Sequence, residues 1–88
     1  MDHDSKADVL KRLAYVEGHL AAVRRMIEAD TYCVDVMKQM YAVRRGIEKA
    51  ETKILDGHLH HCVMDAVNEG RQDEVFEELV ELYSLANR

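Results

Sequence analysis

The chain has 88 residues, no proline, no tryptophan and a formal net charge of −5, from 12 Lys and Arg against 17 Asp and Glu. A chain of this length forms one domain with a modest core, so assembly with further copies is a natural source of stability. It contains no run of about 18 apolar residues that would predict a membrane span, and its polar, acidic N-terminus is unlike a secretory signal. We therefore expect a cytoplasmic protein without a membrane partner, in which two cysteines indicate a metal or redox pair rather than a structural disulfide.

The first predicted helix opens at Ser5, because Ser5 followed by Asp8 resembles a capping box. Apolar residues then recur at alternating steps of four and three from Val9 to Ile27, which predicts a sustained amphipathic helix. We expect this helix to end near Ala29–Thr31, where polar side chains can cap the next helix.

The rest of the chain predicts two further helices and no strand. A long helix runs from about Tyr32 to Asn68, with apolar residues repeating every seven positions, and the Asn-Glu-Gly sequence that follows is a stop signal. A shorter helix spans about Gln72 to Ala86. These elements predict an all-α, three-helix domain over residues 5–88, preceded by a flexible arm at residues 1–4.

Cys33, His58 and Cys62 are the candidate metal ligands. In one continuous helix with about 100° per residue, all three fall within roughly 20° of Cys33 on a single stripe, unless Gly57 breaks the helix. At about 1.5 Å per residue, however, Cys33 and His58 are about 37 Å apart along the axis, too far for one metal. Two antiparallel helices bring the start of one beside the end of the other. The spacing therefore predicts a site shared between subunits, and two such sites per dimer.

Two thiolates and one imidazole form a soft, low-coordinate set that suits trigonal copper(I) best. Zinc(II) is one alternative, but it requires a fourth ligand or a water molecule. Nickel(II) is a second alternative, for which His3 of the N-terminal arm can serve as an added ligand. His61 lies about 80° off the stripe and is a candidate accessory ligand. A lone cysteine or histidine on an apolar stripe is more often structural, but three such residues on one stripe favour a ligand set.

The net acidic charge taken alone argues mildly against nucleic-acid binding, but the charges are unevenly distributed. Residues 1–50 carry nine Lys and Arg against eight Asp and Glu, whereas residues 51–88 carry three against nine. A tetramer can gather the basic residues of the first half into one surface, although solvated helix faces explain the same pattern. These basic residues include Arg12, Arg44, Arg45 and Lys49. We do not expect an enzyme, since neither a glycine-rich phosphate loop nor a Ser/His/Asp arrangement is present.

The sequence resembles the bacterial CsoR/RcnR family of metal-sensing transcriptional repressors in three segments, Lys11–Leu20, Tyr32–Val36 and His58–Val63. The order and spacing of the segments match, and the resemblance covers nearly the whole chain. It implies a three-helix protomer that forms an antiparallel dimer and then a disc-shaped dimer of dimers, without the usual helix-turn-helix. That assembly agrees with the shared site inferred from the ligand spacing.

By this resemblance, the copper-sensing branch of the family has its Cys, His and Cys ligands at Cys33, His58 and Cys62. Tyr32 and Glu78 match positions that couple the metal to the DNA-binding state. The nickel and cobalt branch adds an N-terminal histidine, which His3 matches, and replaces the last cysteine with histidine, which Cys62 does not match. Formaldehyde sensors lack the second thiol and persulfide sensors lack the histidine, so both are disfavoured.

The DNA-binding basic residues of the family fall, by the same resemblance, on Arg12 and Lys49, with Arg44 and Arg45 nearby. His19 stands where the family usually has glutamine.

The sequence thus predicts a copper(I)-responsive repressor, whose apo tetramer binds operator DNA and releases it when metal binds between subunits. Two alternatives stay open. One is a nickel(II)-responsive repressor of the same fold, with His3 as an added ligand. The other is a metal-buffering or interaction helical bundle without a DNA target, which the acidic net charge supports.

Overall fold

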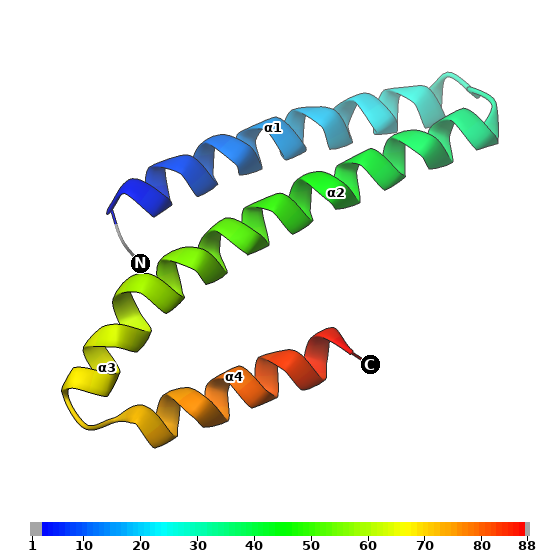
Figure 1. Cartoon of the computed structure of the whole chain (residues 1–88). Coiled ribbons are helices and arrows are strands. Elements are labelled where there is room, and N and C mark those ends of the chain that lie inside the picture. Colours follow the sequence, from blue (N-terminus) through cyan, green and yellow to red (C-terminus); the bar gives the residue numbers. More distant parts are fainter. Residues whose placement is uncertain (1–2, 88) are drawn as a thin grey trace.

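The protein is described here by a computed structural model, which covers the backbone of residues 3–87 and the side chains of residues 5–87. The helical elements are α1 (His3–Glu28), α2 (Cys33–Gly57), the π-helical segment η1 (His58–Val63), α3 (Met64–Asn68) and α4 (Gln72–Ala86). No strand occurs among the described residues. Because α2, η1 and α3 follow one another without a break, the chain forms three helical arms, and the all-α, three-helix prediction is confirmed (Figure 1).

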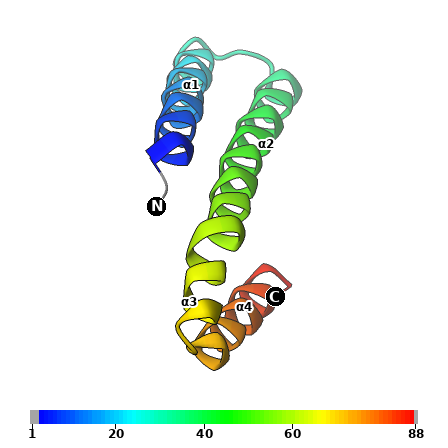
Figure 2. The same ribbon diagram turned by 60° about the vertical axis from the view of Figure 1, so that its left-hand side comes forward.

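The helices α1 and α2 lie side by side and antiparallel (Figures 1 and 2). The buried side chains Val23, Val36 and Val43 form the centre of their interface, and Val16 and Met26 pack against this cluster. Gly46 allows a close approach, because a Cβ at this position would lie 2.9 Å from Cγ2 of Val16. The heptad-like apolar stripes read from the sequence therefore face one another across this hairpin.

Two turns end the first two arms by the same hydrogen-bond pattern. After α1, Thr31 N–H donates to the Met26 carbonyl at 2.9 Å, and Asp30 adopts a positive φ of 54°. After α3, Arg71 N–H donates to the Ala66 carbonyl at 2.8 Å, and Gly70 has φ 79°. Both are Schellman motifs with a left-handed residue at the turn. The predicted stop at residues 68–70 is confirmed.

The predicted caps at the starts of the first two helices are wrong. α1 already begins at His3, so Ser5 lies inside the helix, where it is buried with 8% of its surface exposed. α2 has Tyr32 at its N-cap, without a side-chain cap hydrogen bond. Tertiary packing of Ser5, and the use of Asp30 to end the preceding helix, override these local capping preferences. Residues 1 and 2 of the expected flexible arm lie outside the described residues.

The long arm from Cys33 to Asn68 has the predicted extent, but it is not α-helical throughout. Residues His58–Val63 form a π-helix, in which hydrogen bonds run from residue i to i+5. A π turn is equivalent to one residue inserted into an α-helix, so it turns the following side chains by roughly 100°. The predicted stripe therefore holds as far as His58, and the π turn changes the direction of Cys62.

The protomer is far more extended than a compact domain of its length. Its radius of gyration is 17.3 Å, whereas a compact chain of this size has about 12 Å. Its accessible surface is 7148 Å², roughly 1,900 Å² more than a folded monomer of this mass exposes. Large apolar side chains of every arm contribute to this surface, among them Leu20, Met40, Phe76 and Leu85. The excess area is of the size that stable interfaces bury, which favours a chain built to assemble with further copies.

None of the described helices is both long enough and apolar enough to cross a membrane.

Candidate metal site and nucleic-acid interface

The structure places His58 and Cys62 together. Both line one small cavity of about 170 Å³, together with Ile54 and Gly57 at the end of α2. His58 is partly buried and Cys62 is an exposed free thiol. Because both residues belong to η1, the π turn sets the direction in which each side chain leaves the helix. Departures of this kind from α geometry are frequent at functional sites.

Cys33 lies at the opposite end of the same helical arm. It is the first residue of α2, it is exposed, and its thiol is free. Among the described residues, no group of three His, Cys, Asp or Glu side chains comes close enough to hold a metal ion. One protomer therefore brings two of the three predicted ligands together and leaves the third about 37 Å away along the helix axis. The assignment of these three residues as ligands stays a prediction.

The predicted accessory residues are also separated within one protomer. Tyr32 precedes Cys33 and is exposed at the turn between α1 and α2. Glu78 belongs to α4, the helix that follows the opposite end of the long arm (Figure 1). His61 is exposed in η1, where it already has an interaction partner. The side chain of His3 lies outside the described residues, so the added nickel ligand stays a prediction as well.

His60 is exposed to solvent and pairs with a carboxylate of α2. Its Nε2 lies 3.2 Å from Oδ1 of Asp56, and 72% of its side chain is exposed. Two further features lie at the same end of the protomer, near α4. His58 lines an open, mainly apolar groove of about 690 Å³, which Leu82 and Leu85 of α4 also line. Arg71, just before α4, has its pKa raised by its hydrogen bond to Glu69 and by that carboxylate's charge, with smaller contributions from Glu74 and Glu78.

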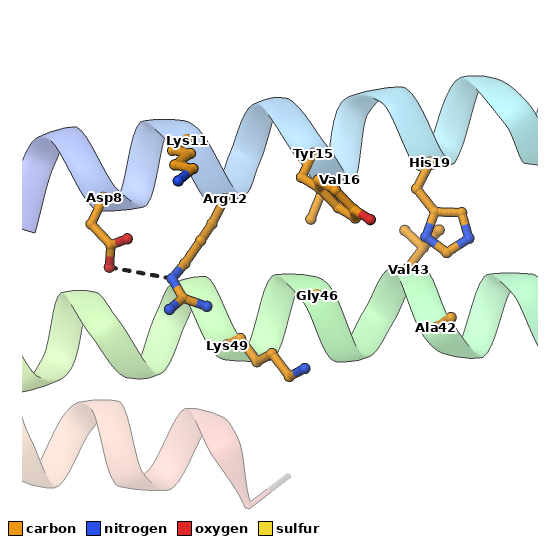
Figure 3. A pocket seen from close by; sticks show the side chains of 10 residues that line it. All are labelled: Asp8, Lys11, Arg12, Tyr15, Val16, His19, Ala42, Val43, Gly46 and Lys49. Carbon is orange, nitrogen blue, oxygen red and sulfur yellow. Dashed lines mark hydrogen bonds and ion pairs between the residues drawn. The ribbon is translucent and has the colours of Figure 1, made fainter.

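A second candidate site lies along the hairpin of α1 and α2. Two adjoining hollows of about 480 and 400 Å³ share Arg12 and Lys49 in their walls. We call this surface the basic groove. Figure 3 shows its α1 wall, with Tyr15 and His19 beyond Arg12, facing α2. The basic residues of the groove are Lys11, Arg12, Arg45, Lys49 and Lys53.

Three of the four predicted DNA-binding residues line the basic groove, and one does not. Arg12, Arg45 and Lys49 converge on it, although they come from two helices. Arg44 does not line it, and its guanidinium instead lies over the Tyr41 ring, 5.9 Å from the ring centroid. Lys53, which also lines the groove, was not predicted from the sequence as a member of this surface. The spacing of Arg45, Lys49 and Lys53 at four-residue intervals was a usable signal, because it places all three on one face of α2.

Carboxylates already neutralise part of the basic groove. Oδ2 of Asp8 lies 3.3 Å from Nε of Arg12 and 3.7 Å from Nζ of Lys53. Glu48 pairs with Arg45. Lys11 and Lys49 have no ion pair with another described residue. All these groups are substantially exposed, so each pair contributes little to stability, and a phosphate group can replace the carboxylate.

His19 occupies the end of the basic groove and joins the two helices. Its Nε2 lies 2.8 Å from Oε1 of Gln39 in α2. An amide oxygen only accepts hydrogen bonds, so Nε2–H of His19 donates. A histidine at this position thus retains a polar link between α1 and α2.

A family model described as metal-sensitive transcriptional repressor matches residues 5–84. The chain belongs to this repressor family. The family consists of transcriptional regulators, so the chain is a repressor and not an enzyme, as the sequence predicts. The resemblance seen in the three sequence segments is confirmed.

Members of this repressor family that resemble the chain include copper sensors. The chain is 44% identical over 78 residues to the copper-sensing transcriptional repressor CsoR of Mycobacterium ulcerans (strain Agy99). This match covers 89% of the chain and 67% of that protein. The chain is 33% identical over 78 residues to the copper-sensing transcriptional repressor CsoR of Bacillus subtilis (strain 168). This match covers 89% of the chain and 77% of that protein. The chain spans about two thirds of the length of its mycobacterial relatives.

The fold agrees with that of a repressor of known structure. The crystal structure of the copper-sensing repressor CsoR with Cu(I) from Geobacillus thermodenitrificans NG80-2 matches with a TM-score of 0.93 at 26% identity. The match covers 100% of this chain and 92% of that chain.

Proposed function

We propose that this chain is a copper(I)-responsive transcriptional repressor, which acts in the cytoplasm on operator DNA as a homotetramer built from two antiparallel dimers. Membership of the metal-sensitive repressor family and the similarity to repressors named as copper sensors support this function. They do not favour the nickel(II) repressor or the metal-buffering bundle.

The observation that carries the proposal is a divided Cys/His/Cys set. His58 and Cys62 line one cavity in η1, while Cys33 lies at the other end of the arm. An antiparallel second copy brings the partner subunit's Cys33 beside this cavity, and two-fold symmetry creates a second such site. Two thiolates and one imidazole fit copper(I), which prefers soft ligands and low coordination numbers, better than zinc(II), which requires a fourth ligand.

The accessory residues fit the same arrangement. Tyr32 precedes Cys33 and accompanies it to the partner subunit's cavity, whereas His61 belongs to the same π-helical segment as His58. Glu78 comes from α4, which lines the groove beside His58. Copper(I) bound at this site would supply a covalent link between the subunits. The surrounding polar groups would then sense whether that link is present.

Operator DNA binds, in this proposal, along the basic groove. Arg12, Arg45 and Lys49 converge there and can contact successive phosphates, whereas Arg44 is directed elsewhere. Metal binding favours a tetramer conformation with lower DNA affinity. Thermodynamic linkage makes the effect reciprocal, so DNA lowers copper affinity by the same factor, with a typical coupling of about 1–3 kcal/mol.

The decisive experiment measures both metal binding and DNA binding by the reduced chain of 88 residues. Anaerobic titration with copper(I) against a competing chelator, followed by X-ray absorption, should give one copper per subunit bound by about two sulfurs and one nitrogen. Fluorescence anisotropy with a duplex selected from a random pool by the apo protein should show release on copper loading. Copper uptake that leaves DNA affinity unchanged would refute the switch, and four-coordinate nickel uptake that depends on His3 would replace copper with nickel.

A further inference from the structure

The first turn of α1 packs directly on the residue that precedes the candidate metal ligands. Ser5 is buried, and Gly57 is buried opposite it at the end of α2. A Cβ added at Gly57 would lie 2.7 Å from Oγ of Ser5 and 3.2 Å from its Cβ. A side chain at position 57 therefore requires the Ser5 side chain, or the first turn of α1 that carries it, to shift. The start of α1 is therefore positioned by the backbone immediately before His58.

The packing of α1 against α2 continues from Ser5 and Gly57 into the basic groove. Ser5, Asp8 and Arg12 are three and four residues apart, so they lie on one face of α1. Lys53 is four residues before Gly57, and it pairs with Asp8 at 3.7 Å. The next α2 residue at this spacing, Lys49, lines both hollows of the groove together with Arg12 (Figure 3).

We propose that Ser5 is a positioning residue, whose contact with Gly57 transmits the position of η1 to Arg12 in the basic groove. α1 is a continuous helix, and Arg12 lies only about 10 Å along its axis from Ser5. A shift of the backbone at Gly57 therefore moves the first turn of α1, and Arg12 moves with it. This inference rests on the proposed function, since it assigns the route between the metal segment and the DNA-binding surface.

Substitution of the contacting pair tests this route in the apo protein. In Gly57→Ala the new methyl group displaces Ser5, so the affinity of the apo protein for the selected duplex should fall at least fivefold. The double variant Ser5→Gly/Gly57→Ala places the methyl group in the space that Ser5 vacates and should restore affinity to within twofold. Gly18→Ala is the matched control, because a Cβ there meets no atom within 4 Å, and it should bind within twofold of the unmodified protein.

Three outcomes would overturn the proposal: unchanged DNA affinity in Gly57→Ala, no rescue in the double variant, or an equal loss in Gly18→Ala. If Gly57→Ala does not fold, as judged by circular dichroism, Ser5→Gly alone decides. Ser5→Gly removes the contact without a clash. The factor by which copper lowers DNA affinity should therefore be at least threefold smaller in this variant than in the unmodified protein. An equal factor in the two proteins would refute the route. Failure of the proposed function is distinguishable, since the unmodified protein would then select no duplex or show no copper response.

Discussion

Replacing Asp8 with asparagine should tighten DNA binding. The Asp8 carboxylate lies between Arg12 at 3.3 Å and Lys53 at 3.7 Å, and both cations must exchange it for phosphate when DNA enters the basic groove. The side chains of Asp8 and Arg12 are 34% and 43% exposed, so each ion pair contributes only about 0.5 kcal/mol. Removal of two such competing pairs lowers the free energy of DNA binding by about 1 kcal/mol, which is roughly a fivefold gain in affinity.

The assay is fluorescence anisotropy of the apo protein with a labelled duplex, repeated at several salt concentrations. The gain should shrink as salt rises, because screening weakens exposed charge interactions. Glu28→Gln is a matched control, since Glu28 pairs with Arg24 at 3.1 Å on α1, outside the basic groove. Weaker DNA binding by Asp8→Asn, or an equal gain in Glu28→Gln, would show that Asp8 does not compete with phosphate.

Three further results are expected. Cys33→Ala should abolish copper release of DNA and leave apo DNA binding intact, which gel shifts with and without copper(I) would check; loss of apo binding would instead indicate a structural thiol. Arg12→Ala should weaken DNA binding and reduce the magnitude of the slope of log affinity against log salt by about 1, whereas Arg44→Ala, whose guanidinium lies over Tyr41, should change neither. Gly70→Ala should lower the free energy of unfolding by about 1–2 kcal/mol in urea titration, because its φ of 79° is strained for alanine, and an unchanged midpoint would contradict this.

Local patterns in the sequence were sufficient for the helices. Apolar residues at steps of three and four predict α1, and apolar residues that repeat every seven positions predict the long arm. The glycine in the Asn-Glu-Gly stop adopts the left-handed conformation that such a stop requires. The spacing of Cys33, His58 and Cys62 also predicts that one protomer cannot gather them, and the structure leaves Cys33 at the far end of the arm. These properties follow from residue periodicity and backbone preference, which act over one or two helical turns.

Tertiary structure alone decided the features that depend on contacts between helices. The sequence pattern of residues 58–63 fits an ordinary α-helix, because a single inserted turn leaves no periodic signal, yet this segment is π-helical. Arg44 and Arg45 are neighbours in sequence, but only Arg45 reaches the basic groove, since α1 packs against one face of α2. Ser5 reads as a helix cap and is instead buried against Gly57, more than fifty residues away in the chain. Such pairings are set by how two helices fit together, which no local pattern encodes.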